Sequence, residues 1–367
     1  MRYFVFFLIL FHNLLFCTES LHISKSLDAL ELIGVPKVFK DTQHLDYNEA
    51  YALLNQNKFE TLPLHVKSFG VSHATYWVAL TIKNQEEVQS FIEFQYNQLS
   101  HVDCFVFKKN SLIHSSQNGS SIRINEREVK HLFVRFALIK ADEPLLYLFK
   151  ITSDRPVMLA MKIATESELD YRKLPSIVFI AFFTGCLFIL LCFNFMLYLV
   201  LKAKEYLFYT LYLVSLWMFI MYIHHYTFWL VQEFLWLNGV IKILSTQGVH
   251  IAFLLFTLYF LDIHLLCTFL TRVTYILCFI AMFTFFFLAV QSPLQMIACF
   301  TGMTILAYTL FLGFFALFKK VNFAKWYLIG VLGFYCGTLL FWLMQLGVIE
   351  VPSMAQMFSY GVVCGKC

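Results

Sequence analysis

The sequence has few charged residues, which make up 14% of its 367 positions, against about 25% in an average soluble domain. Hydrophobic residues make up 60%, and the mean hydropathy is +0.70. This composition excludes a disordered chain, and for most of the length it excludes a water-soluble enzyme. The net charge of +4 is small and scattered, which argues against a nucleic-acid partner. We expect a membrane protein with a soluble portion.

Signatures of catalysis are also missing. The sequence contains no HExxH, no GxSxG and no glycine-rich phosphate loop, so we expect no enzymatic activity. The histidines are dispersed without metal-ligand spacing, and no metal or cofactor is expected. Acidic and basic residues are almost absent from the long apolar blocks, which argues against an ion-coupled transporter.

The first 20 residues, MRYFVFFLILFHNLLFCTES, have the pattern of a secretory signal peptide. Arg2 is the short positive region, Tyr3–Phe11 is the apolar region, and small residues allow cleavage after Ser20. The apolar region is too short to cross a bilayer, which takes about 20 apolar residues. An uncleaved anchor is the alternative.

Residues 21–173 are polar and predict an all-β domain of the jelly-roll or two-sheet sandwich type. Alternating or β-rich runs recur between turn residues at Thr75–Lys83, Ser90–Asn97, His101–Lys108, Lys130–Ile139, Pro144–Thr152 and Pro156–Ile163. The alternation in the first run predicts one buried face, with Tyr76 and Leu80, and one wetter face, with Trp77 and Lys83.

Three shorter features complete the predicted soluble domain. Tyr47–Asn57 has helical spacing, and the SSQNGSS segment between His114 and Arg123 is typical of a turn. The lone cysteine of this region, Cys104, is expected to be a buried small side chain. The charged stretch Glu166–Lys173 is interpreted as the boundary, with a helix starting near Pro175.

From residue 174 onward the sequence predicts an all-α transmembrane bundle of seven helices, the last incomplete. The predicted spans are Ser176–Leu201, Tyr206–Val231, Val240–Leu261, Val273–Val290, Leu294–Phe318, Trp326–Ile349 and 353–367. Alternate connections carry all the positive charge of the loops, at Lys202, Lys204, Arg272, Lys319, Lys320 and Lys325. By the positive-inside rule these loops face the cytoplasm and the soluble domain lies outside, in the periplasm of a bacterial inner-membrane protein.

Two stretches resemble a known receptor family. Residues 183–215, FTGCLFILLCFNFMLYLVLKAKEYLFYTLYLVS, are similar to the first two spans of the bacterial seven-transmembrane receptors with diverse intracellular signalling modules. The matching positions are Phe193, Asn194, Tyr198, Tyr206, Leu207 and Tyr209. Residues 72–84, SHATYWVALTIKN, resemble the family's second type of extracellular domain through Tyr76, Trp77 and Asn84.

The resemblance implies a sensory receptor. Its outer domain, similar to carbohydrate-binding modules, would bind a small ligand or a partner, and the helices would pass the signal inward. In this family the output is often a cyclase, a histidine kinase or a phosphatase. None follows the seventh span here, so we expect a truncated gene product or a separate cyclase or kinase partner. A homodimer is expected by analogy with the family. A membrane adaptor or scaffold and a transport component are the alternatives.

Candidate functional side chains have two interpretations each. Trp77, Tyr96 and Tyr147 could stack on a sugar ligand or belong to the core. The polar residues within the spans, Asn194, Gln247, His250 and Gln345, could form a switching cluster or static hydrogen bonds between helices. We hypothesise that Asn194 bonds to a neighbouring helix.

The remaining motifs are weaker. Gly333 and Gly337 form a GxxxG, which allows either a sliding or a fixed close contact between helices. His224 and His225 could sense pH or sit in an interfacial aromatic belt, since adjacent helical residues do not share one face. Cys364 and Cys367 form a C-x-x-C, for which a redox or metal role is disfavoured.

Overall fold

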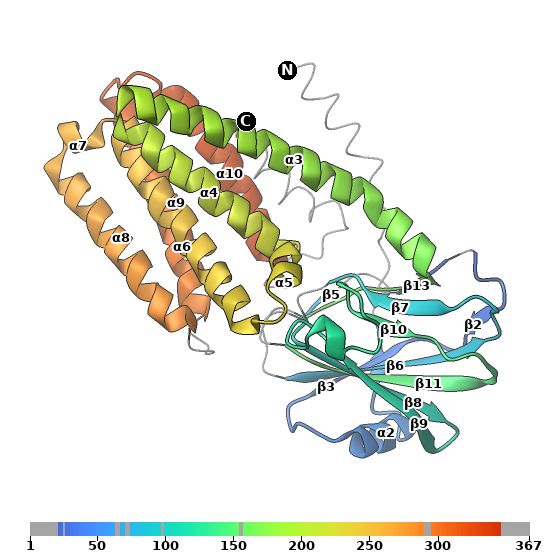
Figure 1. The fold of residues 1–367 in the computed structure, drawn as a ribbon. Coiled ribbons are helices and arrows are strands. Elements are labelled where there is room, and N and C mark those ends of the chain that lie inside the picture. Colours follow the sequence, from blue (N-terminus) through green and yellow to red (C-terminus); the bar gives the residue numbers. More distant parts are fainter. Residues whose placement is uncertain are drawn as a thin grey trace. The chain divides into compact units, whose positions relative to one another are not determined.

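A computed structural model describes residues 21–24, 26–62, 67–69, 74–96, 99–153, 157–289 and 295–345. The predicted signal peptide, the predicted seventh span and the C-x-x-C motif lie outside these residues. The chain divides into two units, with the main boundary between Pro175 and Ser176. Figure 1 shows strands in the first unit and helices in the second.

The first unit contains two facing β-sheets. The smaller has the strand order β1-β13-β7-β10, and the larger has the order β4-β3-β6-β11-β8-β9, with β2 also paired to β6. The β12–β5 pair stands apart, and the β1–β13 pair is parallel while the other described pairs are antiparallel. The strands are β1 (Leu21–Ile23), β2 (Leu30–Leu32), β3 (Lys37–Asp41), β4 (Glu60–Thr61), β5 (Lys67–Ser68), β6 (Thr75–Asn84), β7 (Ser90–Phe94), β8 (His101–Lys108), β9 (Ser111–Asn118), β10 (Arg135–Ala137), β11 (Ala141–Thr152), β12 (Met158–Leu159) and β13 (Met161–Thr165).

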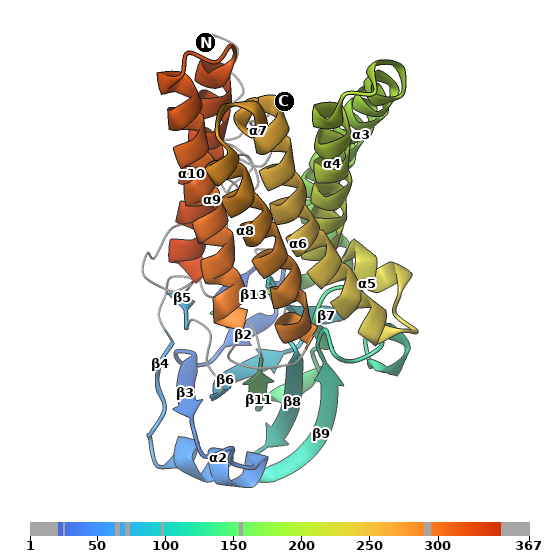
Figure 2. The ribbon, with the colours of Figure 1, turned by 90° about the vertical axis from the view of Figure 1, so that its left-hand side faces the viewer.

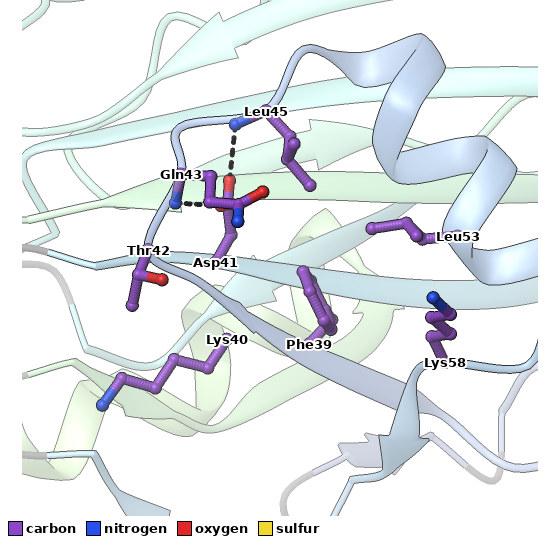
Figure 3. A pocket seen from close by; sticks show the side chains of 8 residues that line it. All are labelled: Phe39, Lys40, Asp41, Thr42, Gln43, Leu45, Leu53 and Lys58. Carbon is purple, nitrogen blue, oxygen red and sulfur yellow. Dashed lines mark hydrogen bonds between the residues drawn. The ribbon is translucent and has the colours of Figure 1, made fainter.

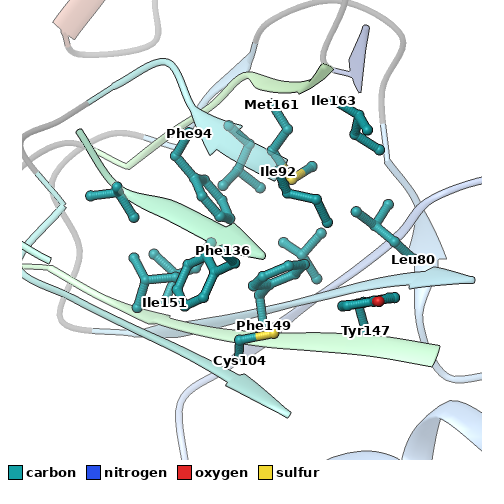
Figure 4. Packing of buried hydrophobic residues seen from close by; sticks show 14 of the residues in the cluster. Leu80, Ile92, Phe94, Cys104, Phe136, Tyr147, Phe149, Ile151, Met161 and Ile163 are labelled. Atoms are coloured by element: carbon teal, nitrogen blue, oxygen red, sulfur yellow. The ribbon is translucent and has the colours of Figure 1, made fainter. Parts of the chain in front are cut away.

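The main core of the first unit lies between these two sheets. Figure 4 shows side chains of β7, β10 and β13 opposite those of β6, β8 and β11. The Phe149 ring lies 5.3 Å from Phe94 and 5.4 Å from Phe136, both edge to face, a favoured aromatic geometry. Cys104 is buried and free, as expected. The predicted two-sheet arrangement is therefore present.

The predicted wetter face of β6 is confirmed at one end of the strand and wrong at the other: Thr81 and Lys83 are half-buried, whereas Trp77 and Ala79 are buried. Helix α2 (Tyr47–Asn55), which was predicted, covers that face of the larger sheet. Asp46 and Glu49 close its first turn as a capping box. Tyr47 stacks on Phe105 at 4.8 Å between centroids. Alternation therefore predicts burial at the end of β6 where the second face is partly open, and it fails at Trp77, where α2 covers that face.

The SSQNGSS segment is not a turn throughout. Strand β9 runs to Asn118, and the chain turns at Gly119, whose φ is +135°. A Cβ at this position would meet the Ser100 carbonyl oxygen, so only glycine fits. The sequence hid β9 because it is an exposed edge strand made largely of serine and other polar residues. A short 3-10 helix, η1 (Ile124–Glu126), follows.

The second unit is helical, and Figure 2 shows its helices side by side. The helices are α3 (Glu166–Leu201), α4 (Lys204–Ile223), α5 (Tyr226–Leu230), α6 (Leu235–Phe260), α7 (Ile263–Leu266), α8 (Thr268–Ala289), α9 (Gln295–Phe318) and α10 (Ala324–Gln345). Within the described residues, α3, α4, most of α6 and most of α9 are long and apolar enough to cross a membrane. The predicted second span ends early, because the chain turns at His224 and at His225, whose φ is +63°.

Close helix contacts occur at glycines other than the predicted ones. Gly302 on α9 lies against the ring of His250 on α6: a Cβ added at Gly302 would lie only 2.9 Å from His250 Nε2. Gly248 on α6 faces Ser215 on α4 in the same way. Among the described atoms, a Cβ added at Gly333 would meet nothing within 4 Å; the side chains around Gly337 are not described, so the GxxxG contact stays a prediction. Motif spacing alone does not show which face of a helix is covered.

Candidate functional site

The junction between the sheets and the first long helix contains no linker. Strand β13 ends at Thr165 and α3 begins at Glu166, with Pro175 inside the helix. The predicted start near Pro175 was therefore wrong, and the charged stretch forms the first turns of α3. These turns, up to Pro175, belong to the first unit. Their charges contact that unit's strands.

Five charged side chains form a junction cluster around Arg135 of β10. The cluster consists of Glu93 on β7, Arg135, and Glu166, Asp170 and Lys173 on α3. The Arg135 Nε donates to Glu93 Oε2 at 2.7 Å, and its Nη2 donates to Asp170 Oδ1 at 2.5 Å. Its Nη1 lies 3.7 Å from Glu166 Oε1. The Lys173 ammonium also donates to Glu93 Oε2, and it lies 3.1 Å above the centre of the Phe133 ring.

Burial makes this cluster costly to break. The Arg135 side chain is fully buried and that of Glu93 is 1% exposed. A buried guanidinium must be paired, since removing one member of a buried pair costs roughly 3–5 kcal/mol. The single negative charge of Glu93 faces two cations, Arg135 and Lys173. The carboxylates of Glu166 and Asp170 on α3 supply the additional negative charge that neutralises the two cations. The folded domain therefore favours the docked position of the first turns of α3.

His131 lies at the edge of the junction cluster and is neutral at pH 7. Burial and, to a smaller extent, the positive charges of Arg135 and Lys173 together lower its pKa to about 4. Its Nδ1 accepts a hydrogen bond from the Phe133 backbone N–H at 3.1 Å, which requires that nitrogen to be unprotonated. The Asp170 carboxylate, 3.7 Å from His131 Nε2, has the opposite effect and raises the pKa of His131.

A second contact ties α3 to the N-terminal strand. Glu168 accepts hydrogen bonds from the hydroxyls of Ser24 and Ser26, the latter at 2.7 Å. Arg172 pairs with Glu168 one turn along the helix. Strand β1 reaches this point by pairing with β13. The first turns of α3 are therefore attached to all four strands of the smaller sheet, directly or through their neighbours.

A hollow of about 240 Å³ lies between β3 and α2, shown in Figure 3. Asp41 at its wall accepts hydrogen bonds from the backbone N–H groups of Gln43 and Leu45, at 2.7 and 2.8 Å, and from the Trp77 indole at 3.2 Å. These bonds lower the pKa of Asp41 against the effect of burial. The carboxylate is thus occupied by the protein itself. The lining residues are Phe39, Lys40, Asp41, Thr42, Gln43, Leu45, Leu53 and Lys58.

The aromatic residues proposed to stack on a ligand lie in or against the cores. Trp77 is fully buried under α2, and Tyr147 is 1% exposed with its hydroxyl accepting from the Ile139 N–H at 2.9 Å. Neither ring has a face open to solvent, so the stacking interpretation does not fit these two residues. Tyr96 is half-buried and packs against the main core. Tyr76 and Asn84 of the strand motif are buried as well.

The polar residues of the helical unit do not form one cluster among the described side chains. The Asn194 amide donates to the Leu190 carbonyl of its own helix at 2.8 Å, so the hypothesis of a bond to a neighbouring helix was wrong. Gln247 is 3% exposed and neither polar atom of its side chain has a hydrogen-bond partner, nor has Nδ1 of His250. The side chain of Gln345 is not described. Of the motif tyrosines, Tyr209 packs against Phe256 in a tilted arrangement, with the ring centroids 5.1 Å apart.

The sequence interpretation missed the junction cluster, although two signals pointed to it. Arg135 interrupts an otherwise apolar strand, and an unpaired arginine is very seldom buried. Glu166, Asp170 and Lys173 follow one another at spacings of four and three, which places them on one face of a helix. A charged stretch with helical spacing before a membrane span therefore indicates docking onto the domain that precedes it, with the boundary between the units directly after it.

Replacing Arg135 by methionine leaves Glu93 and Lys173 buried with an altered charge balance. We expect Arg135→Met to destabilise the first unit by roughly 3–5 kcal/mol. The matched control is Arg123→Gln, since Arg123 is exposed and lies 3.9 Å from Glu126; we expect a change within ~0.5 kcal/mol. Denaturant unfolding of the full chain in detergent measures both. Equal effects of the two substitutions would contradict a buried role for Arg135.

His131 gives the first unit a specific pH dependence. Between its ordinary pKa of 6.5 and the folded value of about 4, the unfolded chain binds more protons, so stability is lost as pH falls through this window. We expect His131→Gln to reduce this loss, by on the order of 1–3 kcal/mol at pH 4. His101→Gln, at an exposed position, should leave the profile unchanged. Thermal unfolding between pH 7.5 and 4 tests this, and identical profiles for wild type and His131→Gln would refute it.

Comparison with known protein families agrees with this two-part organisation. The family model described as 7TM diverse intracellular signalling matches residues 176–365, more than half of the chain. The model described as 7TMR-DISM extracellular 2 matches residues 37–165. No curated protein matches the chain. The chain therefore belongs to the family of seven-transmembrane receptors with diverse intracellular signalling modules, and it carries that family's second type of extracellular domain.

Proposed function

We propose that this membrane receptor binds a small ligand outside the cytoplasmic membrane and passes the signal through seven helices. The β domain would be a jelly roll in the periplasm. Figures 1 and 2 both show the α3–α4 turn, α7 and the α9–α10 turn at one end of the second unit. Lys202, Lys204, Lys319 and Lys320 lie at these turns, which supports a cytoplasmic position for that end.

The junction cluster is the observation that carries this proposal. Arg135 and Glu93 belong to neighbouring strands, β10 and β7, and both bind charged groups of α3. Buried ion pairs tolerate little change in distance, because an unpaired buried charge is costly. A ligand that shifts β7 or β10 must therefore move the start of α3 or break one of its ion pairs. Either event changes a helix that continues for the length of a membrane span.

The ligand site and the output partner are further parts of the proposal. The hollow beside Asp41 is smaller than most ligand pockets, which measure about 300–1,000 Å³. It fits a small polar solute, such as one sugar unit, with Lys40 and Lys58 at its edge. The output would come from a separate cyclase or histidine kinase, and the receptor would act as a homodimer by analogy with the family.

The test uses hydrogen exchange of the full chain in lipid nanodiscs with a panel of sugars. A ligand that protects the β domain should also change exchange in residues 177–201 of the wild type. In Asp170→Asn, which loses one partner of Arg135, binding should persist while the change in 177–201 is lost. Glu126→Gln removes an equally exposed carboxylate outside the cluster and should behave as wild type.

Two outcomes would count against the proposal. If ligand binding never alters residues 177–201 in the wild type, the chain acts as an adaptor instead of a receptor. If Asp170→Asn transmits as well as the wild type does, the junction cluster is not the route.

A further inference from the structure

Four helices, α4, α6, α7 and α8, meet at the ring of Tyr259, near the end of α6. Phe208 of α4 stacks on this ring at 5.2 Å, and His264 of α7 lies 4.7 Å from it. The Tyr259 hydroxyl bonds to the Tyr275 hydroxyl of α8 at 3.1 Å. The Lys204 ammonium, at the start of α4, lies 5.2 Å from the ring centre. We name Lys204, Phe208, Tyr259, His264 and Tyr275 the Tyr259 cluster.

The Tyr259 cluster contains hydrogen-bonding groups and a positive charge that its own residues leave unpaired. Two hydroxyl groups that share one hydrogen bond leave one O–H free to donate. The Nδ1 of His264 is buried and has no hydrogen-bond partner. Among the described residues Lys204 forms no ion pair, although Glu205 is its neighbour and Asp262 lies on the α6–α7 turn. An ammonium, a hydroxyl and an imidazole nitrogen thus gather around one ring, which is a set of groups suited to a phosphate.

The surface beside this cluster is apolar. Leu265 of α7 is 76% exposed, Phe269 at the start of α8 is 69% exposed, and Ile276, next to Tyr275, is 57% exposed. A free phosphate gains nothing from such neighbours, whereas hydrocarbon chains bury them. The groups at this end of the helices therefore match a molecule with an anionic head and apolar tails. Lys202, in the α3–α4 turn, and Arg272, near the start of α8, add to the attraction for an anionic head.

We propose that the Tyr259 cluster binds the headgroup phosphate of an anionic phospholipid, whose acyl chains cover Leu265, Phe269 and Ile276. Lys204 supplies the charge, and the free hydroxyl and His264 orient the phosphate. The bound lipid then joins α4, α6, α7 and α8 at one point. This site is independent of the outer ligand and of the junction cluster.

Native mass spectrometry of the full chain in detergent, titrated with phosphatidylglycerol or phosphatidylcholine, tests the site. We expect one phosphatidylglycerol bound in preference to phosphatidylcholine. Lys204→Gln should weaken that binding about fivefold, the effect of one cation near an anionic lipid. Tyr259→Phe keeps the ring and the fold but loses the hydroxyl, and it should also weaken binding. Lys325→Gln is the matched control, since Lys325 lies over another ring, that of Trp326; binding should stay within twofold of wild type.

Three results would overturn the proposal. Equal binding of the two lipids would show that charge recognition is absent. Equal losses in Lys204→Gln and Lys325→Gln would show a diffuse attraction without a site. Displacement of the lipid by glycerol phosphate alone, at millimolar concentration, would assign the cluster to a soluble phosphate compound.

Discussion

The structure of the first unit depends on the neutralisation of one buried guanidinium. Arg135 sits on β10 with no exposed surface, where an unpaired charge is not tolerated. Its neighbour Glu93 also faces Lys173, so the remaining negative charge comes from Asp170 and Glu166 on α3. Docking of the helix start is therefore a condition for folding of the sheet as well as a contact between elements.

Because of this constraint, the smaller sheet and the start of α3 are expected to move together. The smaller sheet is the layer from which α3 departs, through β13, and it is also the layer that holds α3, through β7 and β10. A change within this sheet has a short path to the helix, without a flexible linker between them. A packed sheet with a buried ion cluster changes between discrete conformations instead of deforming continuously. The receptor function that we propose requires such distinct states.

The sequence predicted the elements that carry simple periodic signals and missed those decided by tertiary contacts. Strand β8 has the predicted bounds, and α2 was predicted because its apolar residues recur at helical spacing. The edge strand β9 was missed because its serines resemble a turn. The burial of Trp77 on the second face of β6 was missed because α2, which is distant in sequence, covers it. The junction cluster was missed because its members, Glu93, Arg135 and Asp170, are far apart in the chain.

A double-mutant cycle between Arg135 and Asp170 tests the central claim most directly. Arg135→Met, Asp170→Asn and the double variant are unfolded with denaturant as full chains in detergent. Coupled residues in one ion network show interaction energies of roughly 0.5–3 kcal/mol. The docked helix predicts a coupling of about 1 kcal/mol or more between strand and helix. Additive effects within ~0.3 kcal/mol would show that the start of α3 is not held by the sheet, and the proposed coupling would fail.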